Sequence, residues 1–433
     1  RQFSIDNANP TPSHADYDGI DRVPAPKQVL LGHHFSSIAG AGPIVGPIIA
    51  TAAFGWLPTL LWIILGSIFI GGVHDYTALV ASIRHKARSI AEIAREQMSP
   101  LAYKLFLAFI WLTLVYVLTV FTDLTATTFV EDGGVATSSL IFMLLAVGFG
   151  LSLYRLKLSL LVSSLIFVPL VLLATWVGHI IPIDAAGVAS FSGLSAGRFW
   201  SVVLILYAFI ASITPVWILL QPRDYLSSYL LYFSILGGFI GILFGGYTID
   251  YPAFTAWHAP GLGAIFPILF ITVACGACSG FHAIVASGTS SKQIDKEGDA
   301  HTIGYGAMLI EGVVAVIALA TVAMLPRGAA LASQAPMTVY GQGIGNFFAV
   351  IGIPHKLGAS FGLLALSTFI LTTLDTATRL GRYIFEEFFG LRGAGSRFLS
   401  TAATLLLPLI FVLITLKDPQ GNPVPVWKAI WPV

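Results

Sequence analysis

The feature that most constrains this 433-residue sequence is a series of long apolar stretches separated by short polar segments. A helix that crosses a lipid bilayer needs roughly 20 mostly apolar residues. Eleven stretches have this character, and they lie near residues 35–53, 56–82, 104–122, 138–154, 157–180, 199–218, 226–247, 262–287, 303–325, 358–379 and 397–416. A shorter apolar piece near 343–353 suits a re-entrant or surface helix. The sequence therefore predicts an all-α polytopic membrane protein.

The composition supports this class. Charged residues make up 10% of the chain, whereas soluble domains carry about 25%, so lipid must cover much of the surface. The net charge of +1 provides no basic field that would indicate a nucleic-acid partner. The two cysteines, Cys275 and Cys278, lie in one apolar stretch. They imply no disulfide framework, and we expect them to act as small packing residues.

The distribution of basic residues predicts an orientation. Cytoplasmic loops of membrane proteins carry an excess of Lys and Arg. If residues 1–34 are cytoplasmic and the spans alternate, most of the 22 basic residues fall on the cytoplasmic side; the exceptions are Arg198, Arg327, Lys356, Lys417 and Lys428. Residues 426–433 resemble the start of a further span, and we expect additional helices beyond both ends of the chain.

The first apolar stretch carries helix breakers at mid-membrane depth, between Gly40 and Pro47. Proline removes a backbone donor, and an unwound segment is tolerated in a membrane only where protein or a cavity satisfies it. Transporters use such breaks to bind anionic groups at the N-terminus of the second half-helix. We predict a substrate site formed by His33, His34, Gly40, Ala41, Gly42 and Pro43. The alternative is close helix packing through small residues.

A second interruption lies in the stretch 262–287, where Ser279, Gly280 and His282 are further candidates for binding substrate. The Cys275-x-x-Cys278 spacing suggests a metal, but no second ligand pair accompanies it. We therefore predict no metal site and no cofactor.

Ionisable residues inside predicted spans are the candidates for ion coupling. Such residues are costly in a membrane and tend to be paired, protonated or functional. Asp75, Glu311 and Asp375 are the predicted proton sites, and Asp375 has the spacing for an ion pair with Arg379. Hydroxyl groups could instead form a sodium site with unwound carbonyls; the candidates are Thr372, Thr373 and Thr376. Arg223 and Asp224 are expected to pair at the cytoplasmic boundary.

Several segments together resemble the carbon starvation protein A family of bacterial inner-membrane transporters, over essentially the whole chain. The resemblance rests on Pro24–Lys27, Gly32–Phe35, Ala39–Pro43, Gly46-Pro47, His74-Asp75, Gln221–Tyr225, Ser279–His282, Ser287–Gln293 and Asp375–Arg382. It implies import of short peptides or pyruvate during carbon limitation. It also implies kinship with the amino acid–polyamine–organocation transporters, which contain inverted five-helix repeats. The first repeat would then cover about 35–180 and the second about 262–433, with inserted helices at 199–247; the span at 199–218 could alternatively open the second repeat.

Four mechanisms fit these residues to different degrees. The leading hypothesis is a proton-coupled symporter of short peptides or pyruvate, and the second is a sodium-coupled symporter of small carboxylates. A metalloenzyme using His33, His34, His74 and Asp75 matches no known zinc spacing. A passive channel fits the scattered breaks and isolated acids less well than alternating access does.

Overall fold

The computed structural model describes residues 3–391, 393, 395–417 and 423–425, so the predicted span start at 426–433 lies outside the described residues. Nine helices in the described part are long and apolar enough to cross a membrane. They comprise Trp56–Arg84, α7 (Pro100–Glu131), α8 (Gly133–Tyr154), α9 (Leu160–Ile180), α11 (Ala196–Ile213), α12 (Leu220–Phe244), Glu297–Ala323, α19 (His355–Phe389) and α20 (Ser396–Leu413). The chain is therefore a multi-pass membrane protein.

Two of these spans contain wider turns. The span Trp56–Arg84 consists of α4 (Trp56–Leu65), a π-helical segment (Gly66–Gly71) and α5 (Gly72–Arg84). The span Glu297–Ala323 begins with a short 3₁₀ turn and a π-helical segment (His301–Gly306) and continues as α17 (Ala307–Ala323). Segments of π-helix often occur at functional sites. The segment Gly66–Gly71 contacts α14 (Ala274–Ala277), and the segment His301–Gly306 contacts α2 (Lys27–Ile38).

The first predicted span is broken as expected. It forms α2 (Lys27–Ile38) and α3 (Gly42–Phe54), which meet at an angle of 42° and count as a tenth span if taken together. The predicted span 262–287 is interrupted more severely. It forms α13 (Ile265–Thr272), α14 (Ala274–Ala277) and α15 (Gly280–Val285), and it continues through a π-helical segment to α16 (Ser291–Gln293). No piece is long enough to span alone, which accounts for the difference between eleven predicted spans and the nine or ten observed.

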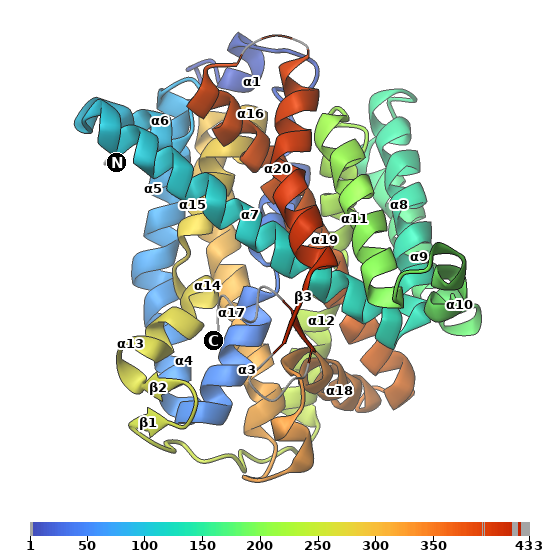
Figure 1. The fold of residues 1–433 in the computed structure, drawn as a ribbon. Coiled ribbons are helices and arrows are strands. Elements are labelled where there is room, and N and C mark those ends of the chain that lie inside the picture. The colour runs from blue at the N-terminus through green and yellow to red at the C-terminus, as the bar shows by residue number, and fades with distance from the viewer. Residues whose placement is uncertain (1–2, 392, 394, 418–422, 426–433) are drawn as a thin grey trace.

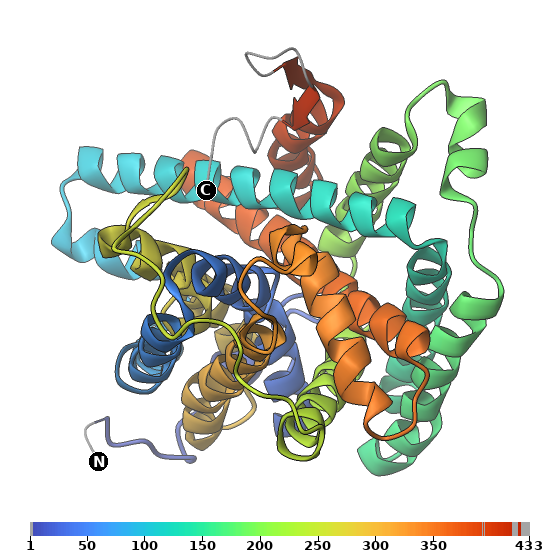
Figure 2. The same cartoon turned by 90° about the horizontal axis from the view of Figure 1, so that it is seen from below.

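The remaining elements are short and lie at the ends of the spans. They are α1 (Pro12–Ala15), α6 (Ile90–Ala94), α10 (Ala185–Ala189), α18 (Pro336–Ala349) and the hairpins β1–β2 (His258–Ala259, Gly263–Ala264) and β3–β4 (Thr415–Lys417, Pro423–Pro425). The short helix predicted near 343–353 corresponds to α18. Figures 1 and 2 show α7 running obliquely across the bundle in contact with α19.

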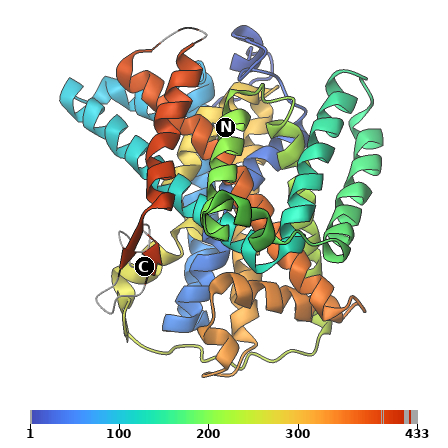
Figure 3. The ribbon, with the colours of Figure 1, turned by 45° about the vertical axis from the view of Figure 1, so that its right-hand side comes forward.

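Contacts among the connecting segments agree with the predicted alternation of sides. At one end the N-terminal segment packs on two others predicted to share its side. The Val216 N–H donates to the Ile20 carbonyl at 2.9 Å, and Ala25 forms a β-bridge with Ile294. In Figures 1 and 3, α1 and α16 lie at this end of the bundle.

The opposite end gathers the segments predicted to lie outside. The Ile183 N–H donates to the Gly133 carbonyl at 3.1 Å, and the Trp56 N–H donates to the Pro252 carbonyl at 3.3 Å. Helix burial also follows a clear order: 83% of the apolar window of α19 is buried, against 28% for α9 and α20. Helix α19 therefore lies in the interior, and most of the polar groups it carries are shielded from both water and lipid.

Candidate functional site

The break in the first span is held by hydroxyl groups from α19. The Thr373 hydroxyl donates to the Ser37 carbonyl at 3.0 Å, and the Thr376 and Ser37 hydroxyls lie 3.0 Å apart. These bonds satisfy polar groups in the last turn of α2, where the helical ladder ends. Thr372, in contrast, bonds within its own helix, to the Thr368 carbonyl at 2.9 Å. Two of the three predicted hydroxyls therefore reach the break.

The second half-helix begins as predicted, with Pro43 in the first turn of α3. Its glycines lie directly against the other interrupted segment. A Cβ atom added at Gly42 would lie 2.4 Å from the Cys275 Cβ, and one added at Gly46 would lie 2.2 Å from the Thr272 carbonyl oxygen. The two breaks thus pack against each other, and glycine is needed because no side chain fits between them.

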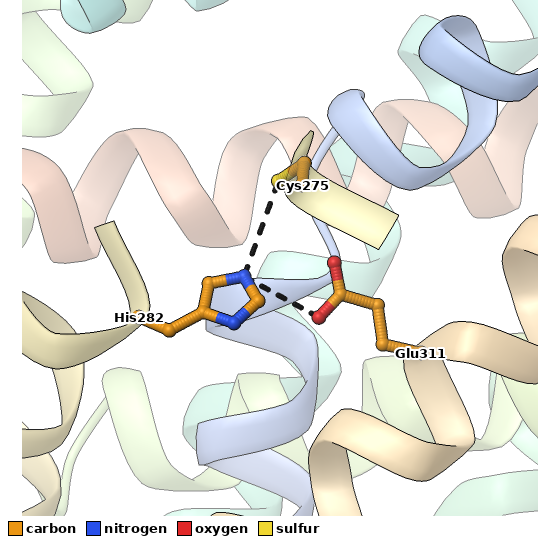
Figure 4. A group of neighbouring side chains, drawn as sticks. All are labelled: Cys275, His282 and Glu311. Atoms are coloured by element: carbon orange, nitrogen blue, oxygen red, sulfur yellow. Dashed lines mark hydrogen bonds and ion pairs between the residues drawn. The ribbon is translucent and has the colours of Figure 1, made fainter. Parts of the chain in front are cut away.

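A buried group of ionisable residues lies beside this contact. His282 Nδ1 is 2.9 Å from Asp75 Oδ2, and His282 Nε2 is 3.4 Å from Glu311 Oε2. His74, which is partly exposed, contributes a ring nitrogen 2.9 Å from Asp75 Oδ1. Figure 4 shows the His282 ring pointing toward both Glu311 and Cys275. The structure therefore brings together three predicted residues, Asp75, His282 and Glu311, from three separate spans.

The two acids of this group differ in their partners. Asp75 lies 2.9 Å from both the His282 and the His74 rings, whereas the fully buried Glu311 meets, within the described residues, the Cys275 thiol and the His282 ring at 3.4 Å. A buried charge is costly unless it is paired. Because Asp75 already has two histidine partners, Glu311 is the carboxylate that needs a proton or a cation beside it to remain buried.

His34 lies on the side of this group formed by α2. Its Nδ1 atom is 2.8 Å from the Ser290 hydroxyl, whereas its Nε2 atom is buried and has no partner among the described residues. An electrostatic interaction also links His34 with Asp75 and His282. His34 thus belongs with the predicted site and has a free ring nitrogen to offer.

His33 belongs to a different buried network. Its Nδ1 atom is 2.6 Å from Asp224 Oδ2, and the same carboxylate accepts hydrogen bonds from Arg223 at 2.8 and 3.1 Å. Arg223 also donates to Asp375, which accepts a further hydrogen bond of 2.7 Å from the Tyr207 hydroxyl. The expected pairing of Arg223 with Asp224 is confirmed. The metalloenzyme set containing His33, His34, His74 and Asp75 does not converge on one point, because His33 faces Asp224.

The predicted ion pair between Asp375 and Arg379 is wrong. Asp375 pairs with Arg223, whereas Arg379 and Arg382 both donate to Asp21 in the N-terminal segment. The reason is that Arg379 lies one helical turn closer to the end of the bundle, where Asp21 offers a carboxylate. Burial alone would raise the pKa of Asp21, but the Arg379 and Arg382 guanidinium groups hold it below its usual value.

Two predicted residues occupy the second break itself. Ser279 is extended at φ −116° and ψ 129°, and Gly280 begins α15. Gly280 is exposed, and a Cβ added there would meet no atom within 4 Å. Sequence reasoning overlooked Asp21, Tyr207 and the role of Arg223 in binding Asp375. The only signal in the sequence was that the Tyr207 hydroxyl lies in an apolar stretch without a charged residue close to it.

An apolar groove lies between α4, the π-helical segment Gly66–Gly71, α12 and α17. It has a volume of about 290 Å³, and isoleucine, valine, leucine and phenylalanine provide most of its lining. It offers few polar groups to an anionic solute. Its chemistry suits a hydrocarbon chain, so the polar candidates remain those at the two helix breaks.

Comparison with known proteins connects this architecture to a family. The sequence profile described as "Carbon starvation protein CstA" matches residues 1–342 and 327–433. A "Peptide transporter CstA" from Bacillus subtilis is 33% identical, with 90% of this chain and 70% of the relative covered, and that of Escherichia coli is 30% identical, with 100% and 70% covered. The "Pyruvate/proton symporter BtsT" of Escherichia coli is 35% identical over 77% of this chain and 47% of its own length.

Among solved structures, a manganese transporter from Eremococcus coleocola shares 15% identity, with coverage of 92% of this chain and 74% of that one, but its TM-score of 0.37 carries no argument. The family profile spans the described bundle and both helix breaks. The chain belongs to the carbon starvation protein CstA family.

Proposed function

We propose that this chain is a secondary active transporter that imports short peptides, pyruvate or both across a bacterial inner membrane during carbon starvation, coupled to protons. One observation carries the proposal: two interrupted spans meet beside a buried group in which two carboxylates face one histidine. The named activities of the relatives, peptide transport and pyruvate/proton symport, supply the substrate class.

The substrate carboxylate is proposed to bind at the start of α3, around Gly40, Ala41, Gly42 and Pro43. Peptides and pyruvate share a carboxylate, and a helix N-terminus favours an anion through its free N–H groups and its dipole. His34 supports this placement because its unpartnered ring nitrogen lies on the preceding half-helix. Ser279 and Gly280 would border the site from the second break. His33 is proposed to shape the site through Asp224.

Proton coupling is proposed to use Asp75, His282 and Glu311, with Asp375 in the neighbouring network. The burial of Glu311 supports this assignment because its carboxylate must take up positive charge to remain buried. Loading with a proton and release on the other side would then accompany the movement of the two broken segments.

An inverted repeat of the amino acid–polyamine–organocation type is proposed for the fold, with eleven spans if the interrupted segment at 265–293 counts as one. The repeats would cover about 35–180 and 262–433, with 199–247 inserted. The pairing of broken segments supports this division, since α2–α3 opens the first unit and α13–α15 opens the second. The mutual contact of the long helices α7 and α19, which hold equivalent places, supports it further.

Residues 1–34 are proposed to face the cytoplasm. The excess of basic residues on that side supports this orientation. Cysteine labelling of intact cells provides the test. A cysteine introduced in the N-terminal segment should react only after permeabilisation, whereas one in the 248–257 loop should react in intact cells.

A sodium-coupled symporter of small carboxylates is the second candidate. Thr373 and Thr376 reach the break and share it with the Ser37 carbonyl, which supplies the oxygen chemistry that a sodium ion needs. Sodium-dependent thermal stabilisation of the purified protein would favour this candidate, whereas equal melting in sodium and choline would count against it.

Uptake into proteoliposomes tests the transport proposal. Vesicles containing the purified protein should accumulate labelled pyruvate or a labelled dipeptide when an inward proton gradient is imposed. Accumulation should collapse on addition of a protonophore. Absence of accumulation of both solutes under proton and sodium gradients would overturn the proposal.

A further inference from the structure

We propose that Cys275, His282 and Glu311 form a binding site for a divalent transition-metal ion of the zinc class. The three side chains come from different parts of the chain: Cys275 from α14, His282 from α15 and Glu311 from α17. One ligand atom from each lies within 4.8 Å of the others (Figure 4). The proposal concerns binding alone, so it does not depend on the transport activity proposed above.

The distances between the ligand atoms fit tetrahedral coordination. Zinc binds nitrogen and oxygen at about 2.0–2.1 Å and thiolate sulfur at about 2.3 Å, so a tetrahedral ion holds N and O about 3.3–3.4 Å apart and N and S about 3.5–3.6 Å apart. The observed separation of His282 Nε2 from Glu311 Oε2 is 3.4 Å, and that of His282 Nε2 from Cys275 Sγ is 4.0 Å. A small side-chain movement of Cys275 completes the arrangement.

The second ring nitrogen of His282 is already positioned for this role. Metal-bound histidines usually donate their other N–H to a carboxylate, which fixes the tautomer and raises the basicity of the ligand. His282 Nδ1 lies 2.9 Å from Asp75 Oδ2, and Asp75 Oδ1 is in turn 2.9 Å from the His74 ring. Asp75 thus leaves Nε2 of His282 as the nitrogen that faces Cys275 and Glu311.

Glu311 provides an independent indication of a ligand. Its side chain is fully buried, and within the described part of the chain its oxygens meet the Cys275 thiol and the His282 ring, the other two members of the group. An ionised carboxylate in such a place costs several kcal/mol unless a cation meets it. A divalent ion bound by one thiolate, one imidazole and one carboxylate would satisfy Glu311 directly.

The site has an open position and a means of access. Three protein ligands leave a fourth tetrahedral position for water or an anionic group, as in zinc sites that bind other molecules. Cys275 is only partly buried, and Gly280, two residues before His282, is exposed to open space. Cys278 is not a member of the ligand group, although its spacing from Cys275 suggests a cysteine pair. The partners of Cys275 are instead His282, seven residues later in the sequence, and Glu311 in α17.

Cobalt binding to the purified full chain in detergent tests the proposal. After dialysis against a chelator, titration with Co²⁺ should give one equivalent bound, with a thiolate-to-cobalt charge-transfer band and the intense visible bands of a tetrahedral site. Added Zn²⁺ should displace the bound Co²⁺ and abolish both the charge-transfer band and the visible bands. The variants C275S and E311Q should each lose the charge-transfer band or at least tenfold in Zn²⁺ affinity by calorimetry, whereas C278S should match the parent.

Three results would overturn the proposal. The first is a parent protein that binds no stoichiometric Co²⁺ or Zn²⁺, and the second is equal loss of binding in C275S and C278S. Folding is checked separately: C275S should melt near the parent temperature without metal, and Zn²⁺ should raise the melting temperature of the parent and C278S but not of C275S. Zn²⁺ stabilisation retained in C275S and E311Q would also exclude these ligands.

Discussion

Replacing Arg223 by methionine should destabilise the protein more than replacing Asp375 by asparagine. Arg223 is fully buried and donates to two buried carboxylates, Asp224 and Asp375. Its loss leaves both of them without that cation, and removing one partner of a buried ion pair costs about 3–5 kcal/mol. D375N keeps an oxygen acceptor for Arg223 and Tyr207, and Asp224 still neutralises the guanidinium. Losing one hydrogen bond to a charged group costs about 1.5–3 kcal/mol, which sets the upper bound for D375N.

The free energy of unfolding can be compared by titrating the purified variants from mild detergent into increasing fractions of sodium dodecyl sulfate and following tryptophan fluorescence. The double variant R223M/D375N should fall between the single variants, because it removes one unpaired carboxylate. Y207F is the matched control and should cost about 1.5–3 kcal/mol, the usual contribution of a hydrogen bond to a charged group, because its hydroxyl donates to Asp375. A D375N protein as unstable as R223M, or more so, would refute the proposal that Asp224 and Asp375 share Arg223.

Two further predictions concern packing and the N-terminal segment. G46A should lower the melting temperature by an amount corresponding to about 1–3 kcal/mol, since the added Cβ would lie 2.2 Å from the Thr272 carbonyl oxygen. G280A should leave the melting temperature unchanged because open space surrounds that position. Equal melting temperatures of the two variants would contradict the packing of the breaks against each other. D21N should destabilise the protein at neutral pH by releasing two buried arginines of α19. Because the folded-state pKa of Asp21 lies below its unfolded value, its contribution is present above about pH 4 and declines as the pH falls further; a difference between the parent and D21N that grew on acidification would contradict this sign.

The sequence predicted the multi-pass membrane class well, because hydropathy acts locally, whereas the orientation derived from loop charge stays a prediction. Breakers between Gly40 and Pro47 correctly located the bend between α2 and α3. The stretch 262–287 appeared to be one interrupted span, yet it forms several short helices. Hydropathy measures only apolar content, so it cannot show how far an interruption unwinds the chain.

The site was predicted residue by residue but not as an arrangement. Asp75, His282 and Glu311 were each candidates, and no local pattern indicated that three distant spans bring them together. The pairing of Asp375 was wrong for the same reason: the i,i+4 spacing to Arg379 is a local signal, whereas Arg223 approaches from α12 through tertiary packing. The sequence predicts that Cys275 is a packing residue because no second ligand pair accompanies the Cys-x-x-Cys spacing, whereas tertiary packing brings His282 and Glu311 to it.

The most direct test of the account is proton-driven uptake by the Glu311→Gln variant in proteoliposomes, with Cys278→Ser as the matched control. The glutamine side chain retains the shape of the glutamate but can neither carry a charge nor release a proton. We expect E311Q to lose accumulation of labelled pyruvate or dipeptide under an inward proton gradient while it still exchanges internal for external substrate. The control should perform both. Gradient-driven accumulation by E311Q at the level of the parent would contradict the central claim that this buried group couples transport to protons.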